Sequence, residues 1–144
     1  MKKVSDILSR KGISIISITP DTSVLEALRL MADRNIGSVM ILDGANFLGI
    51  MTERDYSRKV VLKGKSSTDT SVSEIMTAQY PRVYISDTVE HCMGLMSTHN
   101  IRYLPVFEND NPIGIISISD LVKATISSHE ETISQLKDYL HASM

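Results

Sequence analysis

Two segments of the chain, 24–34 and 89–99, carry the apolar spacing of a helix. In the first, Leu25, Leu28 and Met31 recur every three residues and so share one helical face. A serine or threonine stands directly before each segment, where its hydroxyl can cap the first helical turn. The pattern therefore predicts two helices with defined starting points.

Each of these helices is followed by two strand-like runs joined by a polar turn, which is the pattern of a β-hairpin. A short extended stretch precedes each helix, and a second helix closes each half. We predict an α/β (α+β) fold with the order β-α-β-β-α in each half. The predicted strands are 13–18, 38–42, 47–52, 82–85, 103–107 and 112–117, and the closing helices are 53–62 and 118–127.

The two halves are copies of each other. Residues 24–61 align with 89–126 without a gap, at an offset of 65 residues, and nine of the 38 aligned pairs are identical. This period is too long for a solenoid repeat and suits two small units packed as a pair with pseudo-twofold symmetry. Two related halves make two related clefts, so we expect function at their interface.

We divide the chain into a first repeat at 4–62, a linker at 63–71, a second repeat at 72–127 and a C-terminal amphipathic helix at 128–144. A short helical lead-in opens each repeat. The linker is polar and contains glycine, as exposed linkers do, and a phosphate contact by its lysines stays open as an alternative. We expect the C-terminal helix to pack on its own chain or on a second copy.

Composition limits the function classes. The chain is 42% hydrophobic and 22% charged, with a formal net charge of -2 and no basic run, so we expect no nucleic-acid partner. The single cysteine, Cys92, excludes a disulfide framework and suits a reducing compartment. No apolar stretch is long enough for a membrane span and no signal peptide precedes the first repeat, so we expect a cytoplasmic protein without a membrane partner.

Catalytic motifs are absent from the sequence. There is no phosphate-binding P-loop, no dinucleotide-binding glycine fingerprint and no His-Glu-x-x-His zinc motif. The four histidines are scattered, so we predict no metal site, and no nucleophile with a partnered base can be assembled. We therefore predict a protein that is not an enzyme and needs no cofactor.

A glycine, a strand end, a hydroxyl and an acid recur together in both repeats. Thr52 is followed at the third position by Asp55, and Ser117 by Asp120, each pair at the start of a predicted helix. A carboxylate there can accept hydrogen bonds from both hydroxyls of a ribose, and the helix N-terminus favours an anion. The same spacing is also that of a capping box, in which the side chains bond only to their own helix. Both interpretations stay open at this point.

The segments 49–55 and 114–120 share the pattern Gly, apolar, any residue, Thr or Ser, two residues, Asp. Together with the β-α-β-β-α order, they resemble a pair of CBS domains, a module that binds adenine nucleotides. The resemblance implies a tandem CBS repeat that acts as a regulatory sensor, with AMP as the first candidate ligand, followed by ADP, ATP, NAD and S-adenosyl compounds. It also implies a flat homodimer and an unidentified regulated protein that senses the ligated shape.

The resemblance assigns the ribose to Thr52, Asp55, Ser117 and Asp120. Candidate phosphate contacts are basic or hydroxyl side chains near the two motifs, because the fork of an arginine suits a phosphate; they are Arg54, Arg102, Arg82 and Ser119. The adenine slot is assigned to residues placed by family analogy where the two halves meet, namely Ile15, Ile36, Gly37, Tyr80 and Ile101.

A scaffold that dimerises through the same fold with empty clefts is the alternative function. It predicts that no adenine nucleotide changes the melting temperature, whereas a ligand that binds the folded state must raise it.

Overall fold

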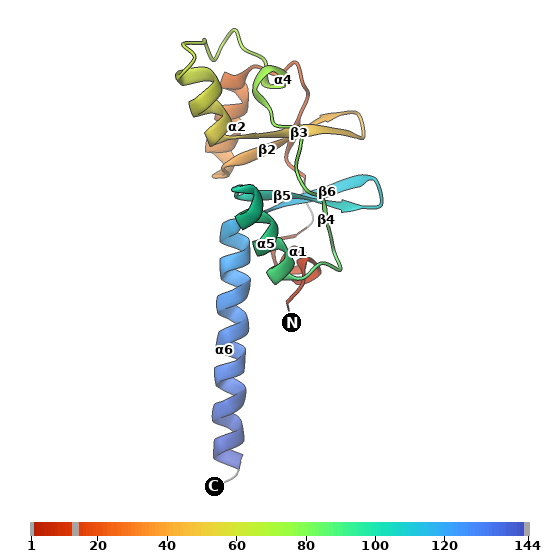
Figure 1. The fold of residues 1–144 in the computed structure, drawn as a ribbon, viewed down its shortest axis with the longest axis vertical. Helices are drawn as coiled ribbons and strands as arrows, with labels where there is room; N and C mark the ends of the chain where they lie inside the picture. Colours follow the sequence, from red (N-terminus) through yellow and green to blue (C-terminus); the bar gives the residue numbers. More distant parts are fainter. Residues whose placement is uncertain (1, 13–14, 143–144) are drawn as a thin grey trace.

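The computed structural model describes residues 2–12 and 15–142, and its fold is shown in Figure 1. The first repeat contains α1 (Val4–Lys11), β1 (Ser17–Ile18), α2 (Val24–Arg34), β2 (Ser38–Asp43), β3 (Asn46–Thr52), α3 (Glu53–Tyr56) and the π-helical turn η1 (Ser57–Val61). The second contains α4 (Val72–Ile75), β4 (Val83–Tyr84), α5 (Val89–His99), β5 (Tyr103–Glu108), β6 (Asn111–Ser117) and α6 (Ile118–Ala142).

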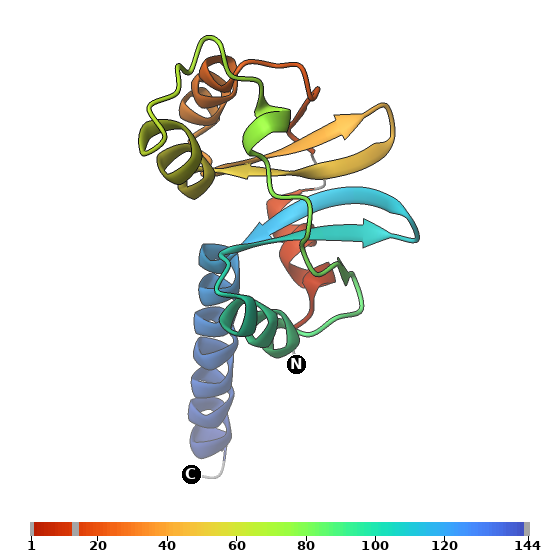
Figure 2. The ribbon, with the colours of Figure 1, turned by 45° about the horizontal axis from the view of Figure 1, so that its top comes forward.

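Two three-stranded sheets form the centre of the molecule, in the orders β1-β2-β3 and β4-β5-β6. In each sheet the first strand runs parallel to the second, and the second and third form an antiparallel hairpin. Figure 2 shows the two sheets stacked on each other, with both hairpin turns on the same side. The predicted fold class and its duplicated order are confirmed.

Capping explains why the helix limits follow the sequence closely. The Ser23 hydroxyl accepts a hydrogen bond from the Glu26 amide at 3.1 Å, and Thr88 accepts one from His91 at 3.0 Å. Each of these helices ends at an asparagine in the left-handed region, a C-cap that asparagine tolerates. The predicted ranges 24–34 and 89–99 match α2 and α5.

The strands and closing helices differ from the prediction in detail. The expected strand at 13–18 is reduced to β1, and residues 13 and 14 lie outside the described part of the chain. The helix predicted over 53–62 divides into α3 and η1, where the Leu62 amide donates to the Ser57 carbonyl at 3.0 Å, five residues back.

The lead-in helices pack in the opposite repeat from the one they open. Val72 and Ile75 of α4 are fully buried in the core of the first sheet, with α2, β2 and β3. Buried residues of α1, including Val4 and Ile7, belong to the core of the second sheet. Burying one such side chain is worth about 1.5–3 kcal/mol. This exchange joins the repeats through their cores, and the sequence pattern alone did not indicate it.

The segment after α4 crosses back to the first sheet. Ile50 and Thr77 exchange two backbone hydrogen bonds of 3.0 Å each. A Cβ atom on Gly49 would lie 2.7 Å from the Thr77 carbonyl oxygen, so glycine is required for this close approach. The bridge brings the Thr77 side chain next to Asp55.

The last helix, α6, is uninterrupted from Ile118 to Ala142, whereas the sequence predicted one helix ending near residue 127 and another beginning at 128. No proline or glycine breaks this stretch. Leu121 and Ala124 of α6 are buried in the core of the second sheet. Figure 1 shows the C-terminal part of α6 extending away from both sheets, and Ile133 there is 53% exposed. Packing of this part on a second copy stays a prediction.

Candidate functional site

Asp55 is held by its own helix cap and by two further residues. Its Oδ2 accepts hydrogen bonds from the Thr52 amide at 2.9 Å and the Thr52 hydroxyl at 3.1 Å. Its Oδ1 accepts from the Thr77 hydroxyl at 2.9 Å and lies 3.0 Å from the Lys59 ammonium. The side chain is 7% exposed. Both carboxylate oxygens are therefore engaged, and the capping alternative describes this copy well.

Asp120 forms the same cap but keeps one oxygen open. Its Oδ2 accepts from the Ser117 amide at 2.8 Å and from the Lys11 ammonium at 2.9 Å. Within 2–12 and 15–142, no hydrogen bond or ion pair reaches Oδ1 of Asp120. Its side chain is 18% exposed. Capping and ligand binding are therefore compatible at Asp120, since one oxygen can still accept ribose hydroxyls.

Two cavities lie at the two motifs, and we name them after their aspartates. The Asp120 cleft has a volume of about 440 Å³, and the Asp55 cleft has one of about 400 Å³. Both volumes fall within the roughly 300–1,000 Å³ of small-molecule sites. The Asp120 cleft is lined by Lys11, Ile15, Ile16, Asn35, Ile36, Gly37, Ser38, Arg102, Tyr103, Gly114, Ile115, Ser117, Ile118, Ser119, Asp120 and Lys123. The Asp55 cleft is lined by Thr52, Glu53, Arg54, Asp55, Thr77, Tyr80, Ile101, Arg102 and Tyr103.

Each cleft combines residues of both repeats. The three slot candidates of the first repeat line the cleft that holds Ser117, Ser119 and Asp120 of the second. The two slot candidates of the second repeat line the cleft that holds Thr52, Arg54 and Asp55 of the first. The structure therefore brings all the sequence candidates except Arg82 together in two crossed sets, each formed by both halves.

The two clefts differ in charge. Lys11, Arg102 and Lys123 line the Asp120 cleft with a single acid, Asp120 itself. The Asp55 cleft has two arginines balanced by Asp55 and Glu53. An anionic ligand is therefore favoured at the Asp120 cleft over the Asp55 cleft.

The candidate arginines have separate positions. Arg102 lines both clefts. Arg54 lines the Asp55 cleft, but its guanidinium donates to the Asn100 carbonyl at 2.7 Å. Arg82 lies outside both clefts, with its guanidinium 4.0 Å from the ring centroid of Phe107. Arg82 is therefore not placed to meet a ligand phosphate in either cleft, and the linker lysines line neither cleft.

Tyr103 lines both clefts and was missed by sequence reasoning. Its hydroxyl occupies the place where a Cβ atom of residue 37 would lie, so Gly37 makes room for it. Burial, and then the negative charge of Glu53, raise the pKa of Tyr103, so the phenol stays neutral near pH 7. Its repeat equivalent is Ser38, and this difference in size was the available signal.

Tyr80 is a second aromatic side chain of the Asp55 cleft, beside Tyr103. Burial, followed by the charge of Asp55, raises the pKa of Tyr80 to about 12. The residue therefore offers a neutral ring to this cleft.

Two lysines of the Asp120 cleft were also missed. Lys11 comes from α1, the lead-in helix of the other repeat, and Lys123 lies one turn after Asp120 on α6. The spacing of Asp120 and Lys123 along a helix was a usable signal. Nothing in the sequence pointed to Lys11, because its position depends on the exchange of the lead-in helices.

A comparison with protein-family models matches two copies of the CBS domain, at residues 4–61 and 72–127. The chain belongs to the CBS-domain family. The resemblance inferred from the two motifs is confirmed.

Relatives of this CBS pair include the CBS domain-containing protein CBSX3, mitochondrial, of Arabidopsis thaliana, which is 32% identical over 95% of this chain and 71% of its own length. The crystal structure of the CBS domain NE2398 is 44% identical, covers 88% of this chain and 99% of its own, and superposes with a TM-score of 0.83. The CBS domain pair of protein MJ0100, solved with 5'-methylthioadenosine and S-adenosyl-L-methionine, is 24% identical and shares the fold. It covers 89% of this chain and 98% of its own, with a TM-score of 0.76.

Within 2–12 and 15–142, no group of three or more His, Cys, Asp or Glu side chains could hold a metal ion. In the same part of the CBS pair, no helix has the length and apolar character that crossing a membrane requires.

Proposed function

We propose that this CBS pair is a non-catalytic sensor that binds an adenosine-containing nucleotide in the Asp120 cleft, with AMP as the first candidate and ADP, ATP, NAD and S-adenosyl compounds after it. The observation that carries the proposal is Asp120. Asp120 lines the cleft, its Oδ2 is fixed by the Ser117 amide and by Lys11, and its Oδ1 has no hydrogen-bonding partner among the described residues. A carboxylate oriented in this way can accept ribose hydroxyls without rearranging its helix cap.

The Asp120 cleft also offers surfaces for a base and a phosphate. Ile15, Ile36 and Gly37 present an apolar wall on the side of the first repeat, which suits the adenine ring. Arg102 supplies a planar cation for the first phosphate. The ligands in the MJ0100 structure belong to that protein, and they support the proposal because the same fold accommodates an adenosine moiety there.

We assign a weaker role to the Asp55 cleft. A ribose there would have to replace the Thr77 hydroxyl or the Lys59 ammonium on Oδ1. The balanced charge of this cleft also gives a phosphate less attraction. We therefore propose that Asp120 is occupied first, and that Thr52, Asp55, Arg54, Tyr80 and Ile101 form a second site of lower affinity.

Signalling requires that the ligand prefer one arrangement of the protein. The Asp120 cleft lies between the repeats, so a bound nucleotide contacts both of them. We propose that binding shifts the packing of the two halves, or of a homodimer, and that a regulated protein senses the result. Cytoplasmic localisation stays a prediction, since one relative carries a mitochondrial designation.

Melting temperatures of the full chain with AMP, ADP, ATP, NAD and S-adenosylmethionine test the proposal. At about 100 times its Kd, a ligand adds about 2.7 kcal/mol to the stability of the folded state. Arg102→Gln is expected to reduce the affinity for AMP, and so the shift in melting temperature that AMP causes, and to leave the affinity for adenosine nearly unchanged. Arg29→Gln is the matched control, because Arg29 is exposed on α2 and pairs with Glu26.

The scaffold alternative makes the opposite prediction for the same measurement. It is favoured by the closed hydrogen bonding of Asp55, which leaves that cleft without an open acceptor on its motif. Unchanged melting temperatures with all five ligands would support the scaffold and exclude the sensor.

A further inference from the structure

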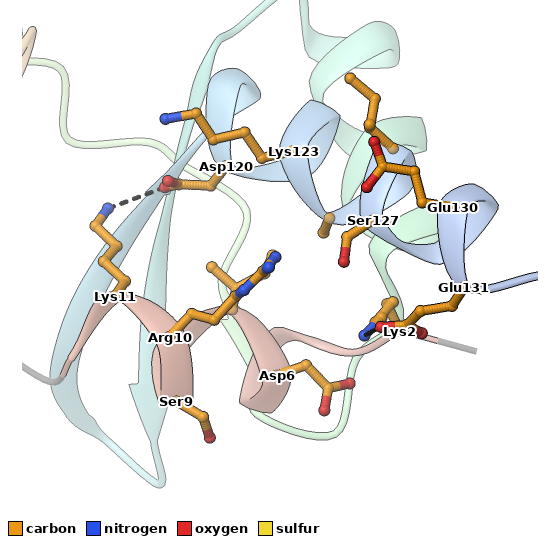
Figure 3. Close-up of a pocket in the computed structure, with 13 residues that line it drawn as sticks. Lys2, Asp6, Ser9, Arg10, Lys11, Asp120, Lys123, Ser127, Glu130 and Glu131 are labelled. Atoms are coloured by element: carbon orange, nitrogen blue, oxygen red, sulfur yellow. Dashed lines mark hydrogen bonds and ion pairs between the residues drawn. The ribbon is translucent and has the colours of Figure 1, made fainter. Parts of the chain in front are cut away.

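A groove of about 640 Å³ lies between α1 and α6 and adjoins the Asp120 cleft. Lys11, Asp120 and Lys123 line both spaces. The Lys11–Asp120 ion pair, 2.9 Å long, therefore stands where the cleft meets the groove. Figure 3 shows this pair between the two helices, with Lys123 on the α6 side. We call this space the α1–α6 groove.

Charge is unevenly distributed along the α1–α6 groove. Lys11 and Lys123 lie at the end beside Asp120, and Figure 3 shows the Arg10 side chain reaching from α1 into the space between the helices. Asp6, Glu130 and Glu131 lie toward the other end, where Glu131 pairs with Lys2 at 3.1 Å. The half of the groove next to the Asp120 cleft is therefore the cationic half.

Arg10 and Lys123 have no ion pair or side-chain hydrogen bond with any residue in the described ranges 2–12 and 15–142. Lys11, by contrast, is fixed by Asp120 and by the Ile115 carbonyl at 2.9 Å. Both side chains line the same groove, so an anion bound there would be attracted by two cations that no carboxylate of these ranges pairs with.

We infer that the α1–α6 groove receives the terminal phosphates of an adenosine di- or triphosphate, with Arg10 and Lys123 as their contacts. This inference rests on the proposed function, because it places the ribose on Asp120 at the junction of the two spaces. Arg102 then serves the first phosphate, and the chain of further phosphates passes Lys11 into the groove. The protein would thereby distinguish ATP and ADP from AMP and adenosine by residues of α1 and α6.

Isothermal titration of the full chain with adenosine, AMP, ADP, ATP and inorganic tripolyphosphate tests this assignment. The double variant Arg10→Gln/Lys123→Gln is expected to bind ATP about tenfold more weakly. This is the loss expected when two partly exposed contacts between a cation and a phosphate are removed. The variant's affinity for adenosine is expected to change less than about twofold. Its affinity for AMP is expected to fall less than its affinity for ATP, because Lys123 also lines the cleft that holds the first phosphate. Arg10→Lys/Lys123→Arg keeps both charges and is expected to retain most of the ATP affinity.

The matched control is Lys63→Gln/Lys137→Gln, which removes two exposed positive charges outside the cleft and the groove. An equal loss of ATP affinity in the control and the groove variant, or an unchanged ratio of ATP to adenosine affinity in the groove variant, overturns the inference. If adenosine and AMP do not bind the unmodified chain, the proposed function fails, and tripolyphosphate decides the groove separately. Tripolyphosphate binding that disappears in the Arg10/Lys123 variant supports an anion site there, and no binding overturns it.

Discussion

Replacing the two motif aspartates one at a time separates a structural role from a binding role. Asp55→Ala removes an acceptor of three hydrogen bonds and an ion pair, all on a side chain only 7% exposed. Loss of a helix cap costs about 1 kcal/mol, and loss of a buried charged acceptor about 1.5–3 kcal/mol. Lys59 is 43% exposed and its ammonium can return to water, so it adds little to the cost. We therefore expect Asp55→Ala to lower the free energy of unfolding by about 3 kcal/mol in total.

Asp120→Ala removes the same kind of cap and an ion pair with Lys11, which is 45% exposed. Losing the cap costs about 1 kcal/mol and losing the exposed ion pair about 0.2–1 kcal/mol, so we expect the free energy of unfolding to fall by about 1.5 kcal/mol. With roughly 3 °C per kcal/mol for a chain of this size, the melting temperature falls about 10 °C for Asp55→Ala and about 5 °C for Asp120→Ala.

Melting curves with and without AMP then measure binding on the same samples. We expect AMP to raise the melting temperature of Asp55→Ala by about as much as that of the unmodified protein. For Asp120→Ala we expect a much smaller rise, from the weaker Asp55 cleft alone. Equal losses of stability in the two variants would refute the structural contrast. A full AMP response in Asp120→Ala would refute the assignment of the ribose to this carboxylate.

Three further predictions concern glycine, cysteine and tyrosine positions. Gly49→Ala is expected to destabilise the fold by about 2 kcal/mol in urea unfolding, because the new Cβ atom would press on the Thr77 carbonyl. Gly114→Ala is the control: its Cβ atom would meet no atom closer than 3.6 Å, so we expect it to be nearly neutral. Burial raises the pKa of Cys92 to about 11, so little of the reactive thiolate forms in the native protein at pH 8. Mass spectrometry is expected to show that iodoacetamide modifies Cys92 slowly in the native protein and rapidly in urea. The pKa of Tyr80 rises from 10.0 to about 12 on folding, so its contribution to stability is complete below pH 10 and is lost between pH 10 and 12, at no more than about 1.36 kcal/mol per pH unit. Unfolding free energies of Tyr80→Phe are expected to show a smaller decline over that range, and an identical decline would contradict the assignment.

The parts of the fold that local chemistry determines could be predicted from the sequence. Caps at both ends fix α2 and α5, and the polar turns fix the two hairpins. The exchange of α1 and α4 could not be predicted in this way. An apolar helix face shows that a helix is buried, and it does not show which of two similar sheets covers it.

The residues of the candidate site also divide into those that the sequence indicated and those that depend on long-range packing. The repeat indicated the residues of the two motifs and the family resemblance indicated those of the slots, and both sets line the two clefts. Lys11 and Thr77 were not found, since each reaches its cleft through packing between elements distant in sequence. Tyr103 was missed although its size difference from Ser38 was visible in the repeat. Arg82 was expected near a phosphate and instead contacts Phe107, which lies on the neighbouring strand β5.

The difference between the two clefts can be traced to the length of the lead-in helices. The shorter helix, α4, ends at Ile75, so the chain is extended at Thr77, pairs with β3 and donates its hydroxyl to Asp55. In α1 the residue that echoes Thr77 is Ser9, which is still helical and donates to the Ser5 carbonyl instead. Because α1 continues to Lys11, the equivalent acid, Asp120, meets an ammonium on Oδ2 and keeps Oδ1 open. One additional helical turn in α1 compared with α4 thus explains why both oxygens of Asp55 are engaged while Asp120 keeps one oxygen open.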